Sequence, residues 1–111
     1  MENLLDKKCQ ACEYGDFAPF SIKEAKQYLQ KISLWQLSAC GKKISRTFDF
    51  KGFYKTMAFV NAVAWVANSE GHHPDMEISF NRCIVHFTTH AVGGLTENDF
   101  ICAAKVDALL S

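Results

Sequence analysis

Three histidines, His72, His73 and His90, are spaced to meet at one end of an expected β-hairpin. An unperturbed imidazole has a pKa of about 6.5, so it both donates and accepts protons near neutral pH. Gly93-Gly94 follows the last histidine and indicates that the chain turns there. We therefore expect a general acid/base site built from these three side chains.

The pattern of apolar residues predicts the elements that must position the histidines. Ser21-Ile22-Lys23-Glu24 has the form of a capping box, which marks the start of a helix. Strict alternation of apolar and polar residues predicts strands on both sides of Gly41-Lys42 and of Asn81-Arg82. The expected ranges are a helix over residues 21–32, strands over 35–39 and 44–50, a helix over 53–69, strands over 76–80 and 83–90, and a helix over 96–110.

This order, α-β-β-α-β-β-α, favours an α+β fold with a four-stranded antiparallel sheet and three helices on one face. A chain of 111 residues, 49% of them hydrophobic, suits a single domain over residues 21–111, preceded by a partly flexible extension over residues 1–20. The second hairpin returns the chain to its start, so His90 should lie near the tandem histidines. His86 shares a face with His90, and we expect it to be exposed.

Composition excludes several classes of function. The 12 Lys and Arg residues balance 12 Asp and Glu residues without a basic run, so direct nucleic-acid binding is not expected. The most apolar run, residues 57–67, is interrupted by Asn61 and is shorter than the ~20 residues of a membrane span. The N-terminus lacks the pattern of a secretory signal, which favours a cytoplasmic location and no membrane partner.

Five cysteines, an odd number, favour reduced thiols over a disulfide framework. Cys9 and Cys12 form the one close pair, and free thiols are favoured there over a zinc site or a redox motif, because no second pair of ligands follows. A zinc site made of the three histidines is a further alternative, but adjacent histidines on a strand or turn tend to point apart. We expect no metal and no other cofactor.

A set of residues around the histidines resembles the signature of the pterin-4a-carbinolamine dehydratases. The matching residues are Gly71-His72-His73-Pro74-Asp75, Phe80, Thr89-His90 and Asp99. The similarity covers roughly residues 20–110 and includes Trp35. The family fold, three helices on a four-stranded antiparallel sheet, agrees with the predicted pattern. The resemblance implies that the chain dehydrates 4a-hydroxytetrahydropterin to quinonoid dihydropterin, in a tetrahydropterin recycling pathway linked to an aromatic amino acid hydroxylase.

The resemblance also implies roles for individual residues. His72 and His90 are expected to transfer protons, and His73 to anchor the pterin and share in catalysis. Trp35 and Phe80 are expected to wall the flat ring, since aromatic ligands favour aromatic pockets. A further candidate is an aspartate, Asp99, which either orients His90 or simply caps the last helix.

One position departs from the family pattern. Members usually carry an ionisable residue, often an acid, four positions before the first histidine, and here that residue is Asn68. Asparagine forms hydrogen bonds but supplies no charge that would raise the pKa of a histidine. Glu70 is a second candidate for this region, although helical neighbours on one face are three or four residues apart, not two.

A non-catalytic role is the main alternative. Some family members act as partners that stabilise dimers of a homeodomain transcription factor. The broad apolar face predicted for the helix over residues 53–69 suits such a role. The same face equally suits a homodimer or homotetramer of this chain.

Overall fold

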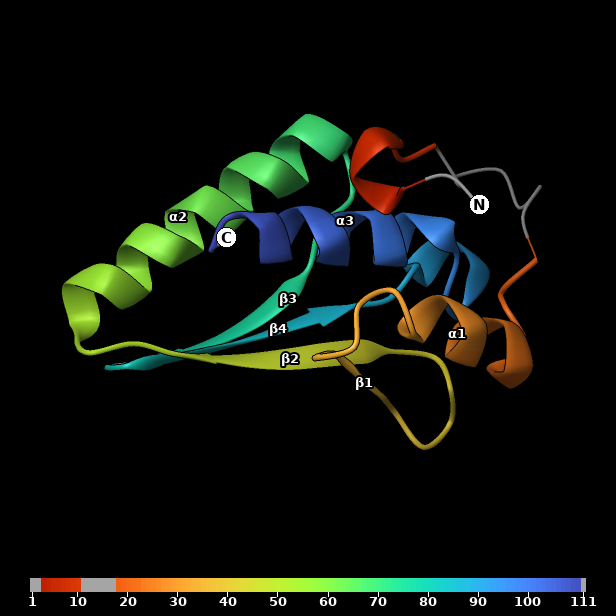
Figure 1. The fold of residues 1–111 in the computed structure, drawn as a ribbon, viewed down its shortest axis with the longest axis horizontal. Coiled ribbons are helices and arrows are strands. Elements are labelled where there is room, and N and C mark those ends of the chain that lie inside the picture. The colour runs from red at the N-terminus through yellow and green to blue at the C-terminus, as the bar shows by residue number, and fades with distance from the viewer. Residues whose placement is uncertain (1–2, 11–17, 111) are drawn as a thin grey trace.

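The computed structural model describes residues 3–10 and 18–110. Within these residues three α-helices cover one face of a four-stranded antiparallel sheet, which confirms the expected fold class (Figure 1). The elements in chain order are the 3-10 helix η1 (Leu4–Asp6), α1 (Ile22–Leu29), β1 (Gln36–Leu37), β2 (Ile44–Asp49), α2 (Phe53–Glu70), β3 (Asp75–Ser79), β4 (Arg82–Phe87), the 3-10 helix η2 (His90–Val92) and α3 (Glu97–Ala108). None of the described helices has the length and apolar character needed to cross a membrane.

The helix ends follow from identifiable capping residues. At the start of α1, Ser21 and Glu24 form the expected capping box, and Thr96 and Asp99 form another at the start of α3. Gly71 ends α2 with a φ of 66°, a left-handed conformation that side chains with a Cβ rarely adopt. The histidine pair follows this glycine directly, so the end of α2 fixes where the pair begins.

The sheet has the strand order β1-β2-β4-β3, so its two hairpins meet where β2 pairs with β4. In the second hairpin, Asp75 at the start of β3 lies opposite His86 near the end of β4. Alternate residues of β2 and β4 point under the helices, as the period of two requires. The buried strand residues are Ile44, Phe48, Cys83, Val85 and Phe87.

His86 lies on the face of the sheet opposite the buried strand residues. Its side chain is only 15% exposed, so the expectation that it is exposed is wrong. Both ring nitrogens have partners on the neighbouring strands, Ser45 at Nδ1 and Glu77 at Nε2. Cross-strand hydrogen bonds therefore cover a histidine that lies outside the core.

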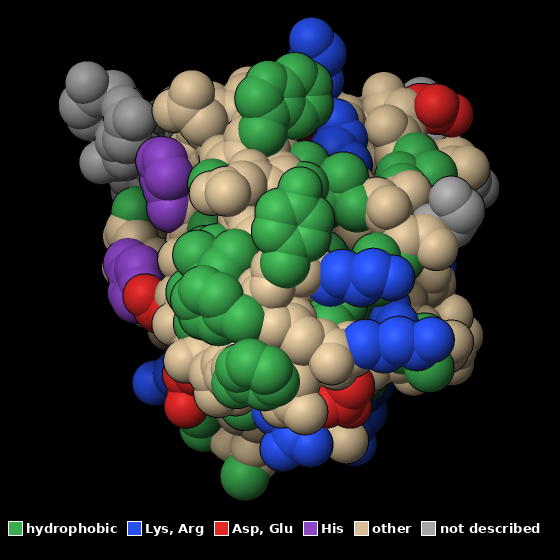
Figure 2. Space-filling model, turned by 90° about the vertical axis from the view of Figure 1, so that its left-hand side faces the viewer, with side chains coloured by type: hydrophobic (Ala, Val, Ile, Leu, Met, Phe, Trp, Pro, Cys, Tyr) green, Lys and Arg blue, Asp and Glu red, His purple; other side chains and the backbone are tan. Residues whose placement is uncertain are grey.

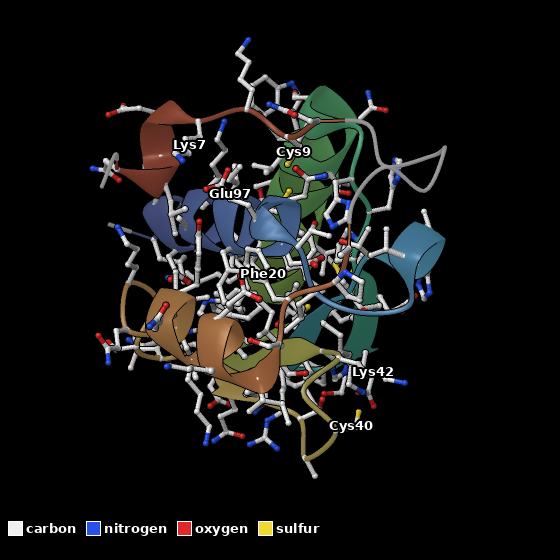
Figure 3. The ribbon with its side chains drawn as sticks, turned by 90° about the vertical axis from the view of Figure 1, so that its right-hand side faces the viewer. Lys7, Cys9, Phe20, Cys40, Lys42 and Glu97 are labelled. Atoms are coloured by element: carbon white, nitrogen blue, oxygen red, sulfur yellow. The ribbon has the colours of Figure 1, made fainter. Side chains whose placement is uncertain are left out.

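Residues 3–10, called here the N-terminal segment, lie against α3. Leu4 is 3% exposed and belongs to the hydrophobic core. Lys7 forms an ion pair with Glu97 in the first turn of α3, with Nζ 2.8 Å from Oε2. Figure 3 shows Lys7 and Glu97 close together, with Cys9 on the same side of the molecule. The described part of the sequence before residue 20 is therefore packed onto the domain.

We predict that Trp35→Phe lowers the free energy of unfolding by about 1.5–3 kcal/mol, because it removes a hydrogen bond to a charged group. Trp35 is 2% exposed, and its Nε1–H donates to Oδ1 of Asp107 at 2.9 Å. Arg46 donates to the same oxygen at 2.6 Å, so the carboxylate stays paired in the variant. Urea unfolding measures the change, with Leu34→Ala at an exposed position as the control. The prediction is contradicted if Trp35→Phe and the wild-type protein have the same free energy of unfolding.

Candidate active site

The three histidines lie at the same end of the β3–β4 hairpin. His72 and His73 precede β3, and His90 begins η2 shortly after β4 ends. Nε2 of His90 lies 3.9 Å from Oδ2 of Asp75, the first residue of β3. Strand pairing therefore returns His90 to the segment that carries the tandem histidines, as the hairpin pattern predicted.

Of the three histidines expected in the site, His72 is the one that the fold holds most firmly. Its Nε2 lies 2.6 Å from Oδ1 of Asp99, and the two side chains are 12% and 0% exposed. The other carboxylate oxygen of Asp99 accepts hydrogen bonds from Thr89 Oγ1–H at 2.8 Å and from the Thr96 N–H at 2.9 Å. The imidazole also stacks on Phe87, with ring centroids 6.0 Å apart. Asp99 thus orients His72 while it caps α3, and the expectation that it orients His90 is wrong.

This arrangement decides which ring nitrogen of His72 carries the proton. An ionised carboxylate only accepts hydrogen bonds, so Nε2 of His72 must be the donor. In the neutral ring Nδ1 is then an acceptor with a lone pair. The pair formed by His72 and Asp99 is therefore arranged to accept a proton through Nδ1.

His73 faces a different space from His72. It lines a surface hollow of about 560 Å³ between α2 and β3, a volume within the range of small-molecule sites. The other residues that line the hollow are Asn61, Ala64, Trp65, Ala67, Asn68, Pro74 and Met76. Asn68, the position that departs from the family pattern, therefore lies beside His73. Among the described residues, no group of three or more His, Cys, Asp or Glu side chains is arranged to hold a metal ion.

Glu70 does not join the histidines. Its Oε1 accepts a hydrogen bond from the Cys9 N–H at 2.9 Å, and its Oε2 pairs with Lys105 Nζ at 2.7 Å. Burial alone would raise the pKa of Glu70, but the hydrogen bonds from Lys105 and Cys9 outweigh burial, and the pKa lies below its ordinary value. Glu70 therefore anchors the N-terminal segment, and the expectation that it belongs to the substrate site is wrong.

The two aromatic residues expected to wall a ligand lie elsewhere. Trp35 is buried behind Phe87, with ring centroids 5.8 Å apart, and has no exposed face for a ring to stack on. Phe80 is 66% exposed in the turn after β3 and stacks on Phe53 at the start of α2. At about 3.3 Å per residue, β3 separates Phe80 from His73 by roughly 20 Å. Within one chain, neither aromatic side chain contacts the space beside the histidines.

The structure adds residues that the sequence did not assign to the site. Thr89 and Thr96 hold the carboxylate of Asp99, and Asp75 faces His90. Thr89 and Asp75 were visible within the motif, but their partners depend on how α3 and the hairpin pack. The capping-box pattern predicted the bond between Thr96 and Asp99, but it did not predict that Asp99 also contacts His72.

Comparisons with known proteins agree with the family that the sequence resembles. The family model described as pterin 4 alpha carbinolamine dehydratase matches residues 18–109. A putative pterin-4-alpha-carbinolamine dehydratase of Nitrosomonas eutropha is 57% identical over 109 residues, which cover 97% of this chain and 94% of the relative. One of Legionella pneumophila (strain Corby) is 51% identical over 109 residues, covering 97% and 96%.

Two solved structures share the fold. A transcriptional coactivator/pterin dehydratase from Brucella melitensis has a TM-score of 0.79 and 30% identity, covering 84% of this chain and 99% of that one. A pterin dehydratase-like protein described as a RuBisCO assembly factor in the alpha-carboxysome has a TM-score of 0.59 and 24% identity, covering 68% and 87%. The second likeness concerns the fold alone.

We predict that Asp99→Asn moves the proton of neutral His72 from Nε2 to Nδ1. The asparagine oxygen must accept from the Thr96 N–H, so its NH₂ group faces the imidazole and donates to Nε2. The ¹⁵N chemical shifts of His72 report the tautomer directly. Glu97→Gln, a first-turn substitution on the same helix, should leave the tautomer unchanged. An unaltered tautomer in the folded Asp99→Asn variant would show that Asp99 does not control it.

We also predict that acid releases the N-terminal segment before the domain unfolds. Burial would raise the pKa of Glu97, but hydrogen bonds from Lys7 and Tyr28 outweigh it and lower the pKa, as occurs at Glu70. Because the folded-state pKa values of these two carboxyl groups are lowered, their ionised forms stabilise the docked segment fully at a pH above about 4.3, the ordinary pKa of glutamate. This stabilisation is lost as the pH falls through the lowered pKa values. Amide exchange at Cys9 in a pH series tests this, and protection that persists until global unfolding contradicts it.

Proposed function

The chain belongs to the pterin 4 alpha carbinolamine dehydratase family, and we propose that it removes water from 4a-hydroxytetrahydropterin. In this reaction the bond between carbon 4a and its hydroxyl oxygen breaks, and the oxygen leaves as water after it is protonated. The proton on ring nitrogen 5 is removed, and quinonoid dihydropterin results. The reaction needs an acid, a base and a fixed ring, and it involves no change of oxidation state.

The observation that carries the proposal is the pair formed by His72 and the buried Asp99. Because Asp99 occupies Nε2 of His72, Nδ1 is the nitrogen that we assign to the removal of the proton from nitrogen 5. We assign protonation of the leaving hydroxyl to His90, which lies at the same end of the hairpin with 78% of its side chain exposed. Histidines suit these steps because an imidazole side chain can both donate and accept a proton.

We propose that the pterin ring lies between His72 and His90, and that one edge of the ring reaches the hollow that His73 lines. His73 and Asn68 both line this space, and both carry groups that form hydrogen bonds with the edge of a heterocycle. In this position His73 anchors the ring and Asn68 supports binding without a charge. Trp65, also in the lining, offers a flat apolar surface for the ring.

The chemistry of the product indicates which reactions precede and follow this one. Quinonoid dihydropterin is at a higher oxidation level than tetrahydropterin, so a reductase must act after this step. We therefore propose that the chain acts in tetrahydropterin recycling, after an aromatic amino acid hydroxylase that forms the carbinolamine. A cytoplasmic location is part of the proposal but does not follow from the reaction. A genomic neighbour encoding such a hydroxylase would support this assignment.

A second candidate function rests on the exposed aromatic residues of α2. Phe53, Tyr54 and Trp65 are 53%, 86% and 71% exposed, which is unusual for side chains of this size. Figure 2 shows several hydrophobic side chains at the surface on the side of the molecule where α2 begins. This surface suits a homodimer or homotetramer, or a different protein partner that it would bind without catalysis. The relative from Brucella melitensis is described both as a coactivator and as a dehydratase.

We predict dehydratase activity that excess chelator does not reduce and that falls by about 10²–10⁴-fold in His72→Ala and in His90→Ala. His86→Ala is the matched control, since the ring nitrogens of His86 are bonded to Ser45 and Glu77 and not to the proposed site residues, and it should keep the wild-type rate. Stopped-flow absorbance with a 4a-hydroxytetrahydropterin measures the rates, and circular dichroism checks the fold. A folded wild-type protein without activity would favour the binding role, and loss of activity with chelator would contradict metal-free catalysis.

A further inference from the structure

Two cysteines that are distant in the sequence meet beneath the N-terminal segment. The sulfur atoms of Cys9 and Cys102 lie 3.5 Å apart although 93 positions separate the residues. Cys9 is partly exposed, whereas Cys102 in α3 is 0% exposed. The sequence pattern pairs Cys9 with Cys12, which lies outside the described residues. The fold instead provides Cys9 with a partner in α3.

We propose that Cys9 and Cys102 form a reversible disulfide that fastens the N-terminal segment to α3. A disulfide has a sulfur–sulfur distance of about 2.05 Å, so the two atoms need to approach by roughly 1.5 Å. The segment is already held on both sides of Cys9. Lys7 pairs with Glu97, and the Gln10 N–H donates to Asn98 Oδ1 at 2.9 Å. We infer that rotation of the two cysteine side chains closes this distance while these contacts hold the segment in place.

The proposed oxidant is a low-molecular-weight disulfide, and the exposure of the two thiols sets the order of the steps. The partly exposed Cys9 thiolate attacks one sulfur of the oxidant, which forms a mixed disulfide and releases one small thiolate. Buried Cys102 then loses its proton and attacks Sγ of Cys9, which forms the internal disulfide and releases the second small thiolate. Two protein thiols are oxidised and one small disulfide is reduced to two thiols, so atoms and electrons balance.

The surroundings of Cys9 make this exchange slow at neutral pH. The hydrogen bond with Cys102 and burial raise the pKa of the Cys9 thiol, and the negative charge of Glu70 adds to the effect. Lys105 partly offsets that charge through its ion pair with Glu70. Because the thiolate is the attacking species, the rate should rise as the pH rises. The pair therefore responds to sustained oxidising conditions rather than to brief exposure.

The disulfide would act close to the histidine site. The N-terminal segment bonds to Glu70, two residues before His72, and to Asn98, the residue before Asp99. Oxidation would thus hold the contacts that flank both members of the His72–Asp99 pair. The disulfide itself is independent of the proposed dehydratase activity, so its test requires no substrate.

The full chain is incubated with mixtures of oxidised and reduced glutathione at mildly alkaline pH, quenched by alkylation and analysed by mass spectrometry. We expect a chain lighter by two hydrogen atoms and a crosslinked peptide that joins Cys9 to Cys102. Because the disulfide would close a long loop, the melting temperature should rise by at least about 5 °C. Dithiothreitol should reverse both changes.

Substitutions identify the pair. Cys9→Ser and Cys102→Ala should each abolish the crosslink, and the alanine keeps the buried position apolar if serine is not tolerated there. Cys12→Ser and Cys40→Ser should both retain it; Cys40 lies in the β1–β2 turn, far from Cys9 in Figure 3. A crosslink between Cys9 and Cys12, glutathione adducts without an internal disulfide, or an unmodified chain under oxidising conditions would each overturn the proposal.

Discussion

The buried carboxylate of Asp99 connects the parts of the chain that form the histidine site. A charge with no exposure to water is costly unless hydrogen bonds compensate for the lost solvation. Here the donors come from three places, His72 after α2, Thr89 after β4 and Thr96 at the start of α3. Each donor is also a constraint, since none of these segments can shift without leaving part of the charge unpaired. The position of His72 is therefore fixed by electrostatics as much as by packing.

This constraint divides the histidines into one held ring and two accessible rings. His72 is fixed by Asp99 on one edge and by Phe87 on one face. His73 and His90 extend from the ends of the same hairpin toward solvent. A base that is already oriented avoids reorganisation during proton transfer, whereas groups that bind and release a substrate must remain reachable. The division of roles proposed for the site follows from this difference in burial.

The sequence allowed prediction of the features that depend on local pattern. Alternation and capping boxes gave the order of the elements, and hairpin pairing brought His90 to the tandem histidines. Residues whose partners lie far along the chain were harder to assign. Asp99 stands close in sequence to His90, yet the packing of α3 directs it to His72. Trp35 illustrates a different difficulty, because an aromatic residue beside a strand fits the core and a ligand site equally well, and only its burial separates the two interpretations.

Glu70 shows why position near a motif is poor evidence of a role in the site. It lies two residues before His72, but helical geometry directs its side chain away from the histidines. There its carboxylate pairs with Lys105 and accepts a hydrogen bond from the Cys9 N–H. The N-terminal segment is consequently held largely by polar contacts, with Leu4 as its buried apolar anchor. Polar contacts at a surface are sensitive to protonation and ionic strength, whereas apolar burial in the core is not. A change in pH or ionic strength can therefore loosen the N-terminal segment while the sheet and the His72–Asp99 pair remain assembled.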